Sequence, residues 1–205
     1  MIQGYASRTG SRRNLRALGA AGWRLLCEPS QLGRYGKKTP PLPYALDSGA
    51  WGCFQRKEVF CEVSYRRLID WLGRDADWIV LPDIVEGGQA SLSFSLKWRS
   101  LVSQFSLPLL AVQDGMRPEE LPQVGPDLGI FVGGSTSWKL ATLMDWGQLA
   151  QERGAYLHVG RVNSAKRIVL CQDARADSFD GTSATRFSCT LPRLDNARRQ
   201  LSLLP

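Results

Sequence analysis

Short apolar runs of strand length alternate along the chain with longer segments in which apolar residues recur at helical spacing. The runs predict strands near Ile2–Ala6, Trp23–Cys27, Tyr44–Leu46, Trp78–Leu81, Leu109–Val112, Gly129–Val132, Ala155–Val159 and Ala176–Phe179. The helical spacing predicts helices over Ser64–Leu72, Ser91–Phe105, Trp138–Arg153, Ser164–Cys171 and Leu191–Leu201. The Pro-rich segment Lys37–Pro43 is typical of a loop before the third strand rather than of a domain linker.

This order of strand, helix and strand predicts parallel strands joined by helical crossovers. Eight such units favour a compact (β/α)8 TIM-type barrel, a single domain over residues 1–205, at the short end of the range for this fold. The alternative is an open, doubly wound sheet. No GxGxxG motif follows the first strand to support a dinucleotide site in such a sheet.

Charge and cysteine usage narrow the class of protein. The chain carries 26 Lys and Arg against 19 Asp and Glu, which gives a net charge of +7. Such an excess is compatible with nucleic acid as a partner, and equally with a basic protein that binds no polyanion. The five cysteines show no CxxC spacing, which favours a reducing compartment. With no apolar signal region and no membrane-length apolar run, we expect a cytoplasmic protein without a membrane partner.

Acids and glycines follow one predicted strand after another, where the loops of a barrel converge on its mouth. One such acid alone is typical of a helix N-cap or a turn. A carboxylate held away from water costs several kcal/mol, so the repetition indicates a site. The residues at these positions are Asp47, Ser48, Asp83, Gln113, Asp114, Gly133, Gly134, Ser135, His158, Gly160, Arg161, Asp177 and Asp180.

Several features have two interpretations. Gly133-Gly134 is either a tight turn or a pair of backbone amides that bind an oxygen of a ligand. His158, the only histidine, is either structural or part of a site at a strand end. Trp51 is either a core residue or a platform for a planar ligand. A group of arginines near the N-terminus either faces solvent or contacts phosphates: Arg12, Arg13 and Arg16.

The segment Asp47-Ser48-Gly49-Ala50-Trp51 resembles the DSGG-aromatic motif of tRNA-guanine transglycosylases. Later segments follow in the order of that family's motifs: LPDIV, VQDG, VGGS, YLHVG and DSFDGTSATR. The resemblance extends from Tyr44 to Arg186. The compact length and the segment HVGRVNSAKRI are more similar to the DNA-acting relatives of phages and genomic islands, which exchange a guanine in DNA for a 7-deazaguanine.

The resemblance implies a glycosyltransferase that forms a covalent sugar–enzyme intermediate. Asp177, the first acid of the DxFD motif, corresponds to the nucleophile, with Asp180 as the alternative, and Asp47 corresponds to the acid and base. The implied base-binding residues are Ser48, Trp51, Asp83, Gln113, Gly133, Gly134 and His158, the last where the family has a second stacking platform. The best candidates for phosphate contacts are Arg161, Lys166, Arg167 and Arg186.

The family's tRNA enzymes carry a zinc site near the C-terminus, and this sequence lacks the Cys/His cluster for it and has little chain beyond Arg186. We therefore expect no zinc or other cofactor, DNA in place of tRNA, and a 7-deazaguanine such as preQ0 as second substrate. Accessory proteins and the oligomeric state stay open. The alternatives are a base-excising DNA N-glycosylase, a non-catalytic nucleic-acid-binding barrel and an enzyme acting on a sugar phosphate.

Overall fold

The computed structural model describes residues 1–32, 39–121, 124–186 and 189–200. Within these ranges, parallel strands pair in chain order and close into an eight-stranded barrel. The strands are β1 (Gln3–Ser7), β2 (Arg24–Cys27), β3 (Tyr44–Leu46), β4 (Ile79–Val80), β5 (Pro108–Val112), β6 (Gly129–Val132), β7 (Leu157–Val159) and β8 (Ser178–Gly181). The predicted (β/α)8 barrel is confirmed.

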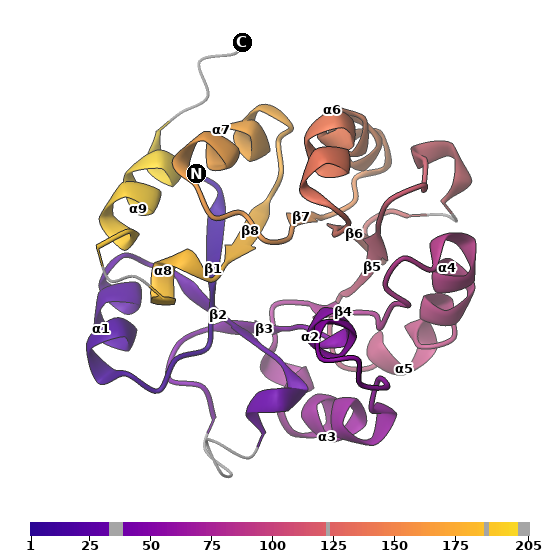
Figure 1. Ribbon diagram of the computed structural model, residues 1–205, viewed down its shortest axis with the longest axis horizontal. Helices are drawn as coiled ribbons and strands as arrows, with labels where there is room; N and C mark the ends of the chain where they lie inside the picture. Colours follow the sequence, from indigo (N-terminus) through magenta and orange to yellow (C-terminus); the bar gives the residue numbers. More distant parts are fainter. Residues whose placement is uncertain (33–38, 122–123, 187–188, 201–205) are drawn as a thin grey trace.

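Helices surround the ring of strands (Figure 1). They are α1 (Arg12–Ala20), α2 (Ala50–Gln55), α3 (Glu62–Leu72), α4 (Gly88–Leu96), α5 (Arg99–Val102), α6 (Thr136–Arg153), α7 (Ala165–Asp173), α8 (Ser183–Arg186) and α9 (Leu191–Arg199). The loops before α1, α6 and α7 each end on a serine whose side chain caps the helix: Ser11, Ser135 and Ser164. Within the described ranges, none of the helices combines the length and apolar character that crossing a bilayer requires.

The structure corrects several predicted elements. The helix predicted over Ser91–Phe105 is two helices, α4 and α5, because the chain turns at Trp98 to bury its indole, 5% exposed, against Tyr65. Helices α1, α2 and α8 were not among the predicted helices. The eighth strand begins at Ser178, two residues later than predicted. Three residues of the predicted segments lie outside the described ranges: Lys37, Lys38 and Leu201.

Side chains alternate between two cores. Outward-facing strand residues such as Leu25, Ile130 and Phe179 join the large core between the barrel and its helices. The inward-facing residues form a smaller cluster inside the barrel, which is rich in aromatic rings: Tyr5, Trp78, Phe131 and Tyr156. The interior is therefore packed with side chains, as in barrels of this class.

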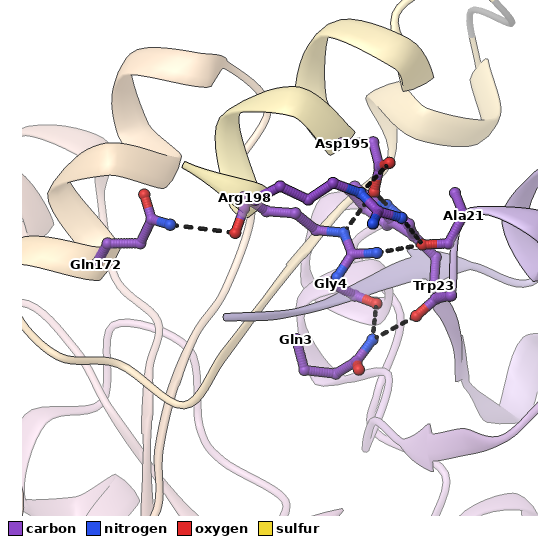
Figure 2. Close-up of polar contacts among 9 residues, drawn as sticks. Gln3, Gly4, Ala21, Trp23, Gln172, Asp195 and Arg198 are labelled. Atoms are coloured by element: carbon purple, nitrogen blue, oxygen red, sulfur yellow. Dashed lines mark hydrogen bonds and ion pairs between the residues drawn. The ribbon is translucent and has the colours of Figure 1, made fainter. Parts of the chain in front are cut away.

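Helix α9, near the C-terminus, forms polar contacts with the segment between α1 and β2 (Figure 2). The guanidinium of Arg198, 1% exposed, donates to the Ala21 carbonyl and to Asp195 Oδ1, at 2.6 Å for the latter contact. The same carboxylate oxygen accepts the indole N–H of Trp23 at 3.0 Å. On the other side, the Gln172 amide donates to the Arg198 carbonyl at 3.2 Å. Helix α9 thereby links α7 to the segment that joins α1 and β2.

Candidate functional site

A pocket of about 340 Å³ opens at the C-terminal ends of the strands, the end of the barrel at which the sequence predicts a site. Its wall combines acids, aromatic rings and glycines with one arginine. The lining residues are Asp47, Trp51, Val80, Asp83, Val85, Glu86, Ala111, Gln113, Asp114, Phe131, Gly133, Gly134, Ser135, Arg161 and Asp180. Three of its carboxylates follow or end β3, β4 and β8, so rigid strands hold them.

Asp47 stands directly after β3, at the start of a sharp turn into α2. Gly49 makes that turn at φ 77°, a conformation that favours glycine, and donates its backbone N–H to Asp47 Oδ1 at 3.1 Å. Burial raises the pKa of Asp47 to about 7, against the effect of the Gly49 hydrogen bond, and the carboxylates of Glu28, Asp180 and Asp83 add to the rise. Near neutral pH this carboxyl can therefore both give and take a proton.

The other two acids have different surroundings. Burial raises the pKa of Asp83 to about 6, and the nearby charge of Arg161 opposes that rise. Asp180, 7% exposed, accepts a hydrogen bond at Oδ1 from the Arg161 backbone N–H at 3.2 Å. The same oxygen lies 3.1 Å from His158 Nε2. Asp180 is therefore held among donors, as a carboxylate requires.

The structure corrects the position expected of Asp177. This residue precedes β8 and lies at the opposite end of the barrel from the pocket, where its exposed side chain accepts the Leu157 backbone N–H at 2.8 Å. Asp180, three residues later, lies inside β8 and lines the pocket. Of the two acids in the DxFD motif, only Asp180 can therefore meet a ligand that Asp47 and Asp83 also meet.

His158 is also placed differently from the expectation that it stacks on a base. Its side chain is fully buried inside the barrel, below the pocket, and stacks on Phe131 with ring centroids 4.9 Å apart. Phe131 lines the pocket in its place. The strand pattern of Leu157, His158 and Val159 carries the signal for this, because alternation turns the middle residue to the inside of the barrel.

Trp51 and Arg161 meet across the pocket. Trp51, on α2, is 39% exposed and stacks on Phe54 with centroids 5.8 Å apart. The Arg161 guanidinium lies over the Trp51 ring at 4.1 Å and donates to the Gly134 carbonyl. Burial lowers the pKa of Arg161. This arginine, expected to contact phosphate, is thus a pocket residue in the present structure.

The remaining predicted residues lie around the pocket in several ways. Ser48 is buried, faces a neighbouring cavity and accepts the Ala50 backbone N–H at 3.3 Å. The Gln113 amide accepts from the Glu86 N–H at 2.7 Å and donates to the Ile84 carbonyl at 2.8 Å, which fixes the loop after β4. Three cationic residues stand outside the lining, on α7 and α8: Lys166, Arg167 and Arg186.

The loop of Gly133 and Gly134 is a tight turn with a carboxylate beside it. The Gly133 N–H donates to the Val112 carbonyl at 2.8 Å. Asp114 accepts both the N–H and the hydroxyl of Ser135, each at 2.5 Å, and these hydrogen bonds lower its pKa against the opposing effect of burial. An acid in this position repels a phosphate, so the loop argues against a sugar-phosphate site.

Sequence reasoning missed several lining residues, among them Phe131, Val80 and Ala111. Each is an inward-facing residue of a strand, so the period-two alternation contains the signal. Glu86 and Val85 come from the loop after β4 and carry no comparable signal. Among the described residues, no group of three or more His, Cys, Asp or Glu side chains has the arrangement of a metal site.

No protein-family model and no curated protein matches the chain. Solved structures do resemble it. A chain of the BexX/CysO complex of Amycolatopsis orientalis matches with a TM-score of 0.55 and 15% identity, over 96% of this chain and 87% of that one. Haloferax volcanii malate synthase, in its magnesium and glyoxylate complex, matches with a TM-score of 0.54 and 9% identity, over 99% of this chain and 75% of that one. The aldolase QR15 matches with a TM-score of 0.50 and 13% identity, over 93% of this chain and 96% of that one. At these identities the similarity shows the shared fold alone.

Proposed function

We propose that this protein replaces a guanine in DNA with a 7-deazaguanine such as preQ0, through a covalent bond between Asp180 and the sugar. The observation that carries the proposal is the pairing of two carboxyl groups in one pocket. Asp47 has a pKa of about 7, suited to proton transfer, whereas Asp180 lies among hydrogen-bond donors, suited to a nucleophile. The motif order from Tyr44 to Arg186 supports the same reaction.

The exchange takes two displacements at the sugar. First, a carboxylate oxygen of Asp180 bonds to C1′, the C1′–N9 bond breaks with its electron pair going to the base, and the Asp47 carboxyl gives its proton to that base. The incoming base then loses its N9 proton to the Asp47 carboxylate. Its nitrogen bonds to C1′ and releases Asp180. Each carboxyl returns to its starting form, so the cycle balances without a further reactant.

The pocket offers recognition for a flat heterocycle. Trp51 and Phe131 supply aromatic faces, and stacking offsets part of the free energy that a base loses on leaving its duplex. Asp83 provides acceptors for the N–H edge of a guanine-like base, and hydrogen bonds of this kind discriminate strongly between bases.

The rim of the barrel supports a polyanionic substrate. Helices α1 and α7 begin at the mouth, and neither has an acid in its first turn, where the helix dipole favours one. Cations stand there instead: Arg12 and Arg13 on α1, Lys166 and Arg167 on α7. Phosphates bound across these turns would complement both the side chains and the helix ends.

Base exchange on DNA tests the proposal. DNA carrying radiolabelled guanine is incubated with the protein, with and without preQ0, and the digested DNA is analysed for the deazaguanine. We expect label release that depends on Asp180. Asp180→Asn should lower turnover by about 10⁴-fold, as removal of a nucleophile does. Asp177→Asn is the matched control and should stay within about twofold, because its side chain lies at the opposite end of the barrel.

Other outcomes identify the alternatives. Release that leaves an abasic site makes the protein an N-glycosylase, with water in place of the incoming base. Release from tRNA in place of DNA changes the substrate and keeps the chemistry. Salt-sensitive DNA binding without release, unchanged in Asp180→Asn, overturns catalysis and leaves a binding barrel.

A further inference from the structure

A chain of hydrogen bonds runs through the inside of the barrel to the pocket. The Tyr156 hydroxyl donates to Ser178 Oγ at 2.8 Å, Ser178 Oγ lies 2.7 Å from His158 Nδ1, and His158 Nε2 lies 3.1 Å from Asp180 Oδ1. Ser178 and His158 are fully buried, and only Asp180 lines the pocket. Ser178, His158 and Asp180 are the residue types of a hydrolase triad. Here, however, the serine is buried beyond reach of a substrate, and the carboxylate is the member that faces the pocket.

Donors and acceptors along this chain fix one tautomer of His158. Ser178 Oγ accepts the hydrogen bond from the Tyr156 hydroxyl, so its own hydroxyl proton is available to donate to Nδ1 of the imidazole. Nδ1 then carries no proton, and Nε2 carries the one that it donates to Asp180. Burial lowers the pKa of His158, which favours this neutral form over the imidazolium, although the hydrogen bond to Asp180 acts in the opposite direction.

The ring is held in this orientation on all sides. Phe131 stacks on it at 4.9 Å between centroids, and Trp78 and Tyr5 contact it at 4.4 Å and 5.8 Å. Rotation of the imidazole would therefore require repacking of the barrel interior. The titratable and charged groups near the ring are Asp180, Lys139, Tyr5 and, through Ser178, Tyr156.

We propose that His158 is a positioning residue that holds Asp180 as an oriented carboxylate through its Nε2–H. Oδ1 of Asp180 carries the hydrogen bonds from His158 and from the Arg161 backbone, which leaves the attack to Oδ2. Ser178 and Tyr156 act one step further away by keeping the proton off Nδ1. The role of Asp180 as nucleophile rests on the proposed function, whereas the tautomer and its hydrogen bond to Asp180 do not.

The tautomer can be measured directly, because His158 is the only histidine in the chain. Protein labelled with nitrogen-15 histidine gives a single pair of ring nitrogen signals, and proton–nitrogen correlation spectra distinguish the two neutral tautomers from the imidazolium. We expect the neutral Nε2–H form at about pH 7. The Nδ1–H tautomer, or an imidazolium, overturns the inference whether or not the protein exchanges bases.

A pair of variants then separates positioning from packing. In His158→Gln the amide nitrogen can replace Nε2 as the donor to Asp180, whereas in His158→Asn it can reach only the Ser178 side. Thermal melting first establishes that both variants are folded. The rate of base release should then stay within about tenfold of the unmodified protein in the Gln variant and fall about 100-fold in the Asn variant, as loss of one preorganised donor does. This rescue by Gln alone is a result that a purely structural role of His158 would not produce, because only Gln restores a donor to Asp180.

Equal losses in the two folded variants overturn the positioning role and make His158 a packing residue. Absence of base release in the unmodified protein overturns the proposed function instead. In that case the ring spectrum alone decides whether His158 holds Asp180 in the way proposed.

Discussion

At the scale of single residues, the site depends on where a carboxyl group stands relative to water and to other charges. Asp47 lies within reach of the charges of Glu28, Asp83 and Asp180, and its pKa is about 7. An acid whose pKa is raised by folding binds protons more tightly in the folded chain, so stability falls as pH rises from its ordinary pKa to its raised one. The loss of folding stability caused by Asp47 is therefore absent below pH 3.8 and complete above about pH 7.

Asp47→Asn should therefore stabilise the protein in a pH-dependent way. Relative to the unmodified chain, we expect the variant to gain on the order of 3 kcal/mol between about pH 4 and about pH 8. Urea unfolding at the two pH values measures this gain. Asp70→Asn, at an exposed position on α3, is the control and should show no such change. A gain of equal size at both pH values would contradict the prediction.

At the scale of elements, the turn from β6 into α6 contains a glycine with positive φ that also forms part of the pocket wall. Gly134 has φ 67°, and a Cβ there would lie 2.6 Å from Asp114 Oδ2 and 2.7 Å from the Trp138 ring. Gly115, in the preceding βα loop, has φ 83° with open space around it. The two glycines share the backbone conformation and differ in what surrounds them.

Alanine at these two positions separates strain from crowding. Gly115→Ala should cost about 1 kcal/mol, the penalty of a left-handed alanine. Gly134→Ala should cost about 2 kcal/mol more, because the methyl group displaces Asp114 or Trp138. Urea denaturation measures both values. Equal costs would show that the pocket wall yields freely at this turn.

The elements also show what the sequence can reveal. Alternation in β6 and β7 marks which residues face inward, and the barrel follows from the succession of strands and helices. In ADSFDG, by contrast, both Asp177 and Asp180 lie close to the apolar residue Phe179 of a short predicted strand. The pattern therefore does not say which of the two acids reaches the mouth of the barrel. Pairing of β8 with β1, from Gln3↔Ser178 to Ala6↔Gly181, decides for Asp180. That register depends on a strand far away in the sequence.

Other features of the site have no local sequence signal. The contact of Arg161 with Trp51 joins the loop after β7 to α2, two segments that only barrel closure brings together. The pKa of Asp47 likewise depends on its burial in the folded barrel and on acids that follow β4 and lie in β8. The sequence can place such residues at strand ends, but their mutual distances are properties of the folded barrel.

At the scale of the whole molecule, α9 secures the seam where the last strand meets the first. Arg198 and Arg199 both bond to Asp195 and to the Ala21 carbonyl, but the Arg198 side chain is 1% exposed and that of Arg199 is 49% exposed. Arg198 also lies over the Trp23 ring at 5.7 Å. The two arginines thus make the same polar contacts in different solvent environments.

Arg198→Ala should destabilise the fold by about 3 kcal/mol, because it removes a buried side chain that packs on the Trp23 ring together with hydrogen bonds that are shielded from water. Arg199→Ala should cost less than about 1 kcal/mol, the usual worth of an exposed ion pair. Urea unfolding of the pair measures the difference. Similar losses in both variants would show that the seam is open to water.

The stack of Arg161 on Trp51 has a consequence for the order in which the substrates of the proposed exchange add. A base that uses this face of the indole must displace the guanidinium, at a cost of about 1 kcal/mol or more. A polynucleotide offers the displaced cation an anionic phosphate in compensation, whereas a free base offers it only neutral acceptors. For the proposed exchange we therefore expect the free protein to bind nucleobases weakly, and the second substrate to enter after a DNA strand has drawn Arg161 aside.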